Sequence, residues 1–276
     1  SVGALTLAES LLVAGLPTRV GQSDWFDWQR ELWEVREKNN QFDLLIESLL
    51  ALSEKVEGDQ RLEALERLVG AQQEIGDFLA ARAGLRDLML IVKADPVRTA
   101  RLRRLLIQNY IESGLVADAE AASVRYQEEY LPDDTEWNLL RGQILIENGA
   151  PSKAVAQLVG LQDQKARLML VLARLYEGSL QPDAVIAHLE GNEAFTFASL
   201  ALENLRTSIT AEAARLANQP EIRVRMLEKL LAADVRPIPM LPAVTSEQLL
   251  IAYVDLATIA GNDAHLLLVN DAEWAK

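Results

Sequence analysis

The sequence predicts an all-α protein, and three observations lead to this prediction. Apolar residues recur at intervals of three and four along most of the chain, as in Leu62, Leu65 and Val69, and this spacing places them on one face of a helix. No run combines apolar–polar alternation with the β-branched residues that are typical of strands. Short sequences containing Gly, Asn, Asp or Pro interrupt the helical pattern, and these residues usually end or begin helices.

The interruptions give the order of the expected helices. They lie at residues 57–59, 76–78, 94–96, 112–114, 131–134 and 147–151. Between them, the apolar stripes predict helices of about 10–18 residues. Helices joined by such short turns must lie antiparallel to their neighbours, so we expect a series of helical hairpins.

Beyond residue 190 the pattern is looser but still helical. The stripes predict helices at about 193–206, 209–217 and 220–233. The segment "RPIPMLPAV" (236–244) contains three prolines and cannot be helical throughout. Thr245 and Gln248 fit a capping box, which predicts a further helix at 246–260.

We therefore expect one helical array with a single interruption. Residues 1–235 form the array, with the clearest repeats at 25–190, and residues 236–244 form a proline-rich loop. Residues 245–276 form a further hairpin of the same array, with its turn at 261–263, truncated at the C-terminus. The chain starts without Met or a basic leader and ends in an apparent helix, so we expect it to be a piece of a longer protein.

The turns between helices recur with a period. The turn residues are Asn40, Gly76, Gly114 and Gly149. Five residues after each turn come Leu45, Ala81, Ala119 and Ala154, at spacings of 36, 38 and 35. A period of this length with two helices per unit is typical of a helical solenoid.

Two segments resemble the tetratricopeptide-repeat (TPR-like) superfamily, with degenerate repeats. The segment "GDFLAARAGLRDLMLIVKADP" (76–96) is similar to the turn and second helix of a repeat, and "LLRGQILIENGAPSKAVAQL" (139–158) to a repeat core. In the second, Gly142 lies at the small position of the first helix, Gly149 in the turn and Ala154 in the second helix. The resemblance implies a right-handed α-α superhelix, a TPR-like helical-repeat solenoid.

The small residues have a physical role in such hairpins. Gly114 and Gly149 can take a positive φ and end a helix without a Cβ clash. Ala119 and Ala154 keep the second helix thin where the first helix crosses it, and a larger side chain there would cost about 1–3 kcal/mol. Each hairpin then has an apolar face that its neighbour covers.

Charge and composition exclude several classes of function. The 276 residues carry a formal net charge of −14, and such a surface repels phosphate backbones, so we expect no nucleic-acid binding. The chain has no cysteine, which excludes disulfides, thiol nucleophiles and Cys-ligated zinc. No apolar run approaches the roughly 18–20 residues that cross a bilayer, so we expect a soluble protein without membrane insertion.

The sequence does not predict catalysis. The two histidines, His188 and His265, lack the partners of a metal-binding helix motif, so we interpret them as surface or interfacial residues and expect no metal or other cofactor. Neither a phosphate-binding glycine loop nor a nucleophile elbow occurs. Adjacent carboxylates such as Glu128 and Glu129 are better interpreted as solvated surface than as an acid–base pair. We expect a chain that is not an enzyme.

The richest aromatic cluster, "DWFDWQRELW" (24–33), has two interpretations. Trp25, Trp28 and Trp33 could stack on a sugar or a peptide. Their spacing favours core packing, however, because Trp25 and Trp28 share one helical stripe and Trp33 lies on a second with Phe26.

The dense basic run "RTARLRR" (98–104) suggests a binding groove. Carried onto the TPR-like pattern, Arg101, Arg104 and Gln108 lie on the concave side of a first helix, where that family binds partner peptides and often holds a carboxylate. The corresponding positions on other first helices are Arg30, Glu34, Glu66, Gly70, Leu139 and Gln143. A simpler interpretation stays open, in which these arginines form surface ion pairs with Glu-rich neighbouring helices.

The sequence therefore predicts a non-catalytic protein–protein interaction scaffold that binds a protein or peptide segment in the concave groove of the array. The alternative is an accessory α-superhelical region of a larger bacterial cell-envelope enzyme, such as a soluble lytic transglycosylase acting on peptidoglycan. Arginine outnumbers lysine, which favours a bacterial protein in either case. The sequence does not fix the compartment, and we lean to the bacterial periplasm or cell envelope. Neither end resembles a polar cap, so the array ends could support self-association.

Overall fold

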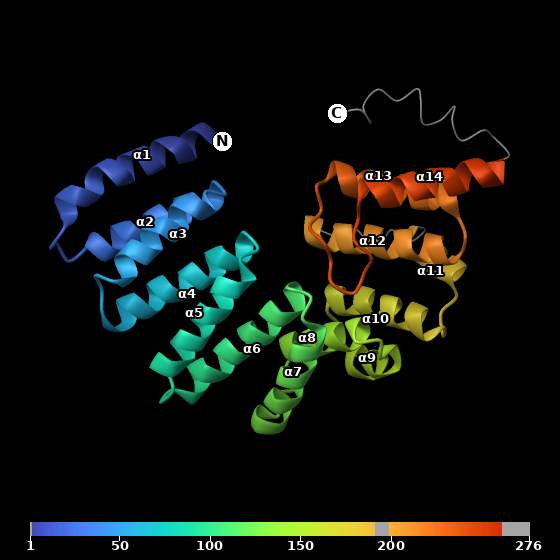
Figure 1. The fold of residues 1–276 in the computed structure, drawn as a ribbon, viewed down its shortest axis with the longest axis horizontal. Coiled ribbons are helices and arrows are strands. Elements are labelled where there is room, and N and C mark those ends of the chain that lie inside the picture. The colour runs from blue at the N-terminus through green and yellow to red at the C-terminus, as the bar shows by residue number, and fades with distance from the viewer. Residues whose placement is uncertain (1, 191–198, 261–276) are drawn as a thin grey trace. The chain divides into compact units, whose positions relative to one another are not determined.

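A computed structural model describes residues 2–190 and 199–260, and Figure 1 shows its fold. These residues form fourteen helices and no strand. The helices are α1 (Val2–Arg19), α2 (Trp25–Lys38), α3 (Phe42–Ser53), α4 (Gly58–Glu74), α5 (Phe78–Ile91), α6 (Pro96–Glu112), α7 (Val116–Tyr130), α8 (Thr135–Glu147), α9 (Pro151–Leu158), α10 (Gln164–Glu177), α11 (Pro182–Glu190), α12 (Leu200–Leu216), α13 (Pro220–Ala232) and α14 (Ser246–Ala260).

The chain divides into two compact units, Ser1–Leu131 and Pro132–Lys276, which we call unit 1 and unit 2. This division was not predicted from the sequence. Leu131 caps the end of α7 with a left-handed backbone, at φ +45°, and Pro132 cannot continue a helix. Both residues therefore favour a break at this position.

Within each unit, consecutive helices pack against each other. Each helix contacts the next along the chain, and in unit 2 α10 also contacts α8 and α12. The predicted all-α helical-repeat fold class is therefore confirmed for the residues that the structure describes. None of the described helices is both long and apolar enough to cross a membrane.

Unit 1 consists of α1 followed by the hairpins α2–α3, α4–α5 and α6–α7. Gly114 ends the first helix of the third hairpin with φ +72°, which confirms the predicted positive φ. Ala81 and Ala119, five residues after their turns, are completely buried. The largest buried side chains of this unit include Trp33, Leu45, Leu49, Leu85, Leu88, Leu102, Ile107 and Ile111.

Unit 2 repeats the arrangement in the hairpins α8–α9, α10–α11 and α12–α13, followed by α14. Gly149 has φ +69° and Ala154 is completely buried, as predicted. A Cβ on Gly142 would lie 2.7 Å from Leu158 Cδ2, so the first helix of this hairpin needs glycine where α9 approaches it.

One helix boundary predicted from the sequence is wrong. The expected break between 206 and 209 does not exist, because α12 runs without interruption from Leu200 to Leu216. Thr207 and Thr210 donate hydrogen bonds of 2.8 and 2.9 Å to the backbone oxygens four residues earlier. Their hydroxyls are therefore satisfied inside the helix and do not end it.

Between α13 and α14 the chain is not helical from Val235 to Thr245. Half of the predicted capping box is present, since the backbone N–H of Gln248 donates to Thr245 Oγ1 at 3.2 Å. The Gln248 side-chain oxygen accepts from Arg223 Nη2 at 2.8 Å instead of completing the box. The start of the predicted helix 193–206, the turn at 261–263 and the rest of the predicted last hairpin lie outside the described residues.

Candidate functional site

Eight charged side chains form ion pairs between neighbouring first helices of unit 1, and we call this set the first-helix ladder. Its members are Arg30 and Glu37 on α2, Asp59, Glu63, Glu66 and Arg67 on α4, and Arg98 and Arg101 on α6. Three of the predicted groove residues belong to it, namely Arg30, Glu66 and Arg101. The predicted groove and the ladder therefore overlap at these three positions.

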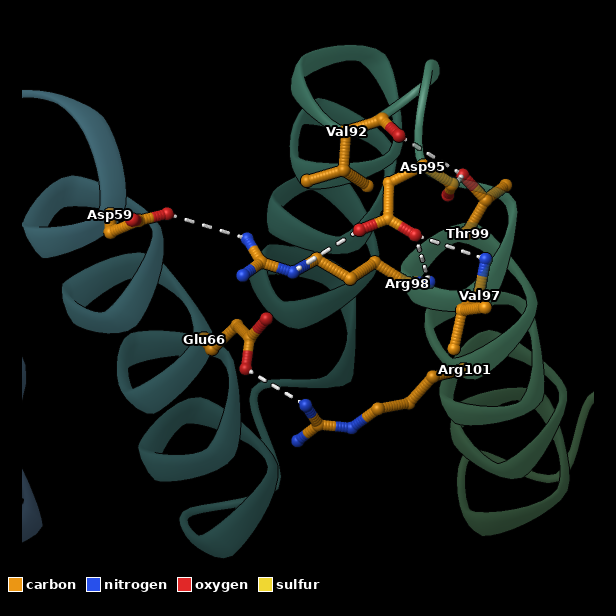
Figure 2. Close-up of polar contacts among 8 residues, drawn as sticks. All are labelled: Asp59, Glu66, Val92, Asp95, Val97, Arg98, Thr99 and Arg101. Carbon is orange, nitrogen blue, oxygen red and sulfur yellow. Dashed lines mark hydrogen bonds and ion pairs between the residues drawn. The ribbon is translucent and has the colours of Figure 1, made fainter.

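The start of α6 positions its two ladder arginines (Figure 2). Asp95 caps the helix, and its Oδ1 accepts the backbone N–H groups of Val97 and Arg98 at 3.1 and 3.0 Å. Pro96 in the first turn has no N–H to satisfy and favours the helical φ. Arg98 and Arg101 are three residues apart, so both side chains lie on one face of α6, toward α4.

The α2–α4 part of the ladder is closed by a two-bond ion pair. Arg30 donates from Nε and Nη2 to the two carboxylate oxygens of Glu63, at 2.7 and 2.6 Å. The Arg30 hydrogen bond lowers the pKa of the Glu63 carboxyl from its ordinary value of 4.5. Arg67 adds a second bond between the same helices, from Nη1 to Glu37 Oε1 at 3.1 Å. Both guanidiniums therefore join α2 to α4.

The α4–α6 part of the ladder is looser. Arg101 Nη1 lies 3.2 Å from Glu66 Oε2, and the Arg101 side chain is 66% exposed. Arg98 contacts two carboxylates only at longer range, Asp59 at 3.6 Å and Asp95 at 3.5 Å. Pairs of this geometry in solvent contribute about 0–1 kcal/mol. These two arginines can therefore exchange their present partners at little cost.

Two predicted groove residues on α6 lie elsewhere. Arg104 donates from Nε to the hydroxyl of Tyr126 at 2.7 Å and lies over the Tyr126 ring, so it is directed toward α7, the second helix of its own hairpin. Gln108 is exposed and donates to Glu112 within α6, at 2.7 Å. Neither contact joins the two side chains to the ladder.

The remaining predicted positions are also outside the ladder. Glu34 pairs with Lys38 on its own helix at 3.5 Å. Gly70 faces open space, since a Cβ there would meet nothing within 4 Å. Leu139 and Gln143 belong to unit 2, where Leu139 packs against the core cluster of that unit.

The aromatic cluster of α2 is mostly structural. Trp33 is completely buried and makes an edge-to-face contact with Phe26, at 5.5 Å between ring centroids. Trp28 packs against Gly15 of α1, and Arg19 lies 4.4 Å from its ring centroid. Trp25 is half-buried against the core cluster of α2, α3 and α4. These contacts favour the core-packing interpretation.

No group of three or more His, Asp or Glu side chains with metal-binding geometry occurs among residues 2–190 and 199–260. His188 lies exposed on α11, and His265 lies outside the described residues.

Four ladder residues were not predicted from the sequence, namely Glu37, Asp59, Glu63 and Arg67. A usable signal was present, because Arg30 and Glu63 are 33 residues apart and Glu66 and Arg101 are 35 apart. Opposite charges separated by about one repeat lie at equivalent positions of adjacent first helices, so they can form pairs. The simpler interpretation of the basic run, surface ion pairs with neighbouring helices, is present at Arg98 and Arg101.

Comparison with known proteins gives no relative. No family model, no curated protein and no solved structure matches this chain.

Proposed function

We propose that this chain is a non-catalytic protein–protein interaction scaffold, and that Arg98 and Arg101 on α6 hold carboxylates of an acidic partner segment. The carrying observation is the contrast between the two parts of the ladder. Arg30 is fixed to Glu63 by two short bonds, whereas Arg101 is 66% exposed and held to Glu66 by one contact.

Replacing the internal carboxylates by those of a partner costs little free energy, because the internal ion pairs are weak. An exposed ion pair contributes about 0–1 kcal/mol, whereas a two-bond contact between a guanidinium and a partner carboxylate is stronger and directional. The distance between the arginines also suits a peptide, since side chains three residues apart on a helix are neighbours. A segment with two closely spaced carboxylates would engage both guanidiniums.

The overall negative charge of the chain sets a limit on the partner. A net charge of −14 opposes a strongly acidic protein at long range, and salt screens this repulsion beyond roughly 10 Å. Recognition by Arg98 and Arg101 is then local, and it favours a short acidic segment over a large acidic surface. Residues beside the carboxylates would add apolar contact.

The test is fluorescence anisotropy with three labelled peptides of equal length, which alternate Leu with Glu, Gln or Lys. We expect the Glu peptide to bind the protein, and the double variant Arg98→Glu/Arg101→Glu to weaken that binding at least fivefold. The matched control is Arg86→Glu/Arg125→Glu, which makes the same change in net charge at exposed positions of α5 and α7. Circular dichroism checks that helicity is unchanged.

Two results would refute the assignment. Equal binding of the Glu and Gln peptides would show that carboxylates are not recognised. Equal weakening by the α6 variant and the control variant would show that only net charge matters.

The compartment and the wider assembly remain part of this proposal. The excess of arginine over lysine supports a bacterial protein, and a location in the periplasm or cell envelope is proposed with it. The accessory region of a larger peptidoglycan-acting enzyme stays the alternative, and no described residue favours it specifically.

Self-association through the array ends is supported by the exposed Leu7 and Leu11 of α1, whose side chains are 61% and 64% accessible. Sedimentation of Leu7→Glu/Leu11→Glu would test it.

A further inference from the structure

The proline-containing segment between α13 and α14 folds back over earlier helices of unit 2. Residues 237–242, "PIPMLP", run from the end of α13 past α12 to α10, and the chain then returns to α14 (Figure 1). We call residues 237–242 the strap. Ile238, Met240 and Leu241 of the strap pack against the core cluster that α8 to α12 form. The strap therefore covers helices that lie well before it in the chain.

The strap lies on the kind of face that carries the ladder in unit 1. α10 and α12 are the first helices of successive hairpins, as α2, α4 and α6 are. The Tyr176 hydroxyl on α10 lies 3.4 Å from Glu212 Oε1 on α12, 36 residues later. This interval is close to the 33 and 35 residues that separate the ladder pairs. The same hydroxyl lies 3.2 Å from the backbone oxygen of Met240, so the strap occupies the surface between adjacent first helices.

The middle of the strap is a strained turn. The backbone N–H of Leu241 donates to the Ile238 oxygen at 3.2 Å, and Met240 has a φ of +80°. With Pro239 at its second position, this geometry fits a type II turn, whose third position favours glycine. The Cβ of a methionine disfavours that backbone conformation. Such a turn persists only because its surroundings hold it in place.

Few hydrogen bonds attach the strap to the helices beneath it. Its three prolines, at 237, 239 and 242, have no N–H to donate. Within the described part of the chain, the contact with the Tyr176 hydroxyl is the hydrogen bond that joins the strap to a helix. The remaining contacts are apolar and come from the half-buried Ile238, Met240 and Leu241. A separate segment with the same side chains can make the same contacts.

We propose that the strap is an internal occupant of a binding surface on α10 and α12, and that a partner segment of the same chemistry replaces it. That segment is a proline-containing turn with aliphatic residues on both sides of the proline. While the strap is seated, the apparent affinity for the partner is reduced to the extent that the surface is closed. The surface contains none of the ladder residues, so this inference and the proposed function can each fail without the other.

The test is fluorescence anisotropy with a labelled peptide of residues 236–243, "RPIPMLPA". A second peptide of equal charge carries the changes Ile238→Ser, Met240→Ser and Leu241→Ser. In one protein variant, a Gly-Ser linker of equal length replaces residues 237–242, and circular dichroism checks that its helices remain. We expect the first peptide to bind the linker variant saturably and at least tenfold more tightly than it binds wild type. The serine peptide should not bind saturably.

Tyr176→Phe in the linker variant tests the position of the peptide. This change removes the hydroxyl that contacts the backbone oxygen of the turn, so we expect it to weaken peptide binding at least threefold. Tyr110→Phe on α6 of unit 1 is the matched control and should leave binding unchanged.

A measurement on wild type decides the question if the linker variant does not fold. The chain has four methionines, so methyl-¹³C labelling gives four signals, and Met240→Leu assigns the signal of the strap. Excess peptide should move the Met240 signal saturably toward the position of a freely rotating methionine, while Met89 of α5 in unit 1 stays unchanged. An unmoved Met240 signal, equal binding of the two peptides, or equal effects of the two tyrosine variants would each overturn the inference and leave the strap as a structural loop.

Discussion

Arg30 on α2 donates two hydrogen bonds to Glu63 on α4, the next first helix of unit 1, at 2.7 and 2.6 Å. The two residues are 33 positions apart, so the pair joins one repeat to the next. The neighbouring pair of Glu66 and Arg101 spans a similar interval with one bond at 3.2 Å. The ion pair between α2 and α4 therefore holds its arginine firmly. The ion pair between α4 and α6 is weaker, so Arg101 can exchange Glu66 for another carboxylate.

Glu63→Gln should destabilise unit 1 by about 1 kcal/mol at pH 7, since Arg30 is part-exposed and solvent screens the pair. The pKa of the Glu63 carboxyl is lowered in the folded state, chiefly by the hydrogen bond from Arg30. Its contribution is therefore present above the ordinary pKa of 4.5 and is lost as the pH falls through the folded value. Urea unfolding of both proteins at pH 7 and in acid measures the difference.

The control for this pair is Glu34→Gln. Glu34 is 45% exposed and faces Lys38 at 3.5 Å within one helix, so its loss should not change the free energy of unfolding measurably. A difference between wild type and Glu63→Gln that persists unchanged in acid would contradict the assigned role of the carboxylate.

Gly142→Ala should destabilise unit 2 by about 1–3 kcal/mol. The new Cβ would lie 2.7 and 2.8 Å from Leu158 Cδ2 and Cγ, and Leu158 is 1% exposed, so it has little room to move. Gly70→Ala is the matched test on α4, where a Cβ meets nothing within 4 Å. That change should stabilise by about 0.5–1 kcal/mol through helix propensity. Thermal unfolding of both variants should show opposite signs, and equal signs would refute the packing argument.

The hairpins could be predicted because their determinants are local. Gly114, Gly149, Ala119 and Ala154 have the predicted backbone angles or burial, since a tight helical turn and a close helix crossing each restrict the residue type at one position. The cap at Thr245 is local in the same way. The false break inside α12 arose because the direction of a threonine hydroxyl is not visible in a residue pattern.

The candidate site could be predicted only in part, because it depends on how helices cross. Arg101 and Arg104 lie one turn apart in sequence, yet Arg101 reaches Glu66 on α4 and Arg104 reaches Tyr126 on α7. The repeat pattern assigned both to one groove. Which neighbour a long side chain reaches is set by the rotation of its helix and by the aromatic ring beside it, and neither follows from spacing alone.

Glu147→Gln should stabilise unit 2 at neutral pH by less than about 1 kcal/mol. Oε2 of this half-buried residue has no partner among the described residues, and burial raises the pKa of the carboxyl. The folded state therefore disfavours the charged form, and this cost disappears as the pH falls through the raised value toward the ordinary pKa. The advantage of the variant should shrink over that interval in chemical unfolding. A constant advantage at every pH would exclude ionisation as its cause.

Tyr176→Phe should loosen the non-helical segment between α13 and α14. The Tyr176 hydroxyl lies 3.2 Å from the backbone oxygen of Met240 and 3.4 Å from Glu212 Oε1, so it donates to the segment or to the buried carboxylate. Its removal should cost about 1 kcal/mol and speed hydrogen exchange in residues 236–244. Tyr110→Phe is the control, because among the described residues the Tyr110 hydroxyl makes one long contact, at 3.5 Å with Arg86.

The stabilities of wild type and Tyr176→Phe should also differ at high pH. Burial, followed by the charge of Glu212, raises the pKa of Tyr176 well above its ordinary value of 10.0. The neutral phenol is therefore favoured in the folded state, so wild-type stability should fall as the pH rises above 10.0 while that of Tyr176→Phe changes less. Urea unfolding at pH 8 and pH 11 separates the two, relative to Tyr110→Phe. If wild type and Tyr176→Phe lose stability equally over this range, the pKa of Tyr176 is not raised in the folded state.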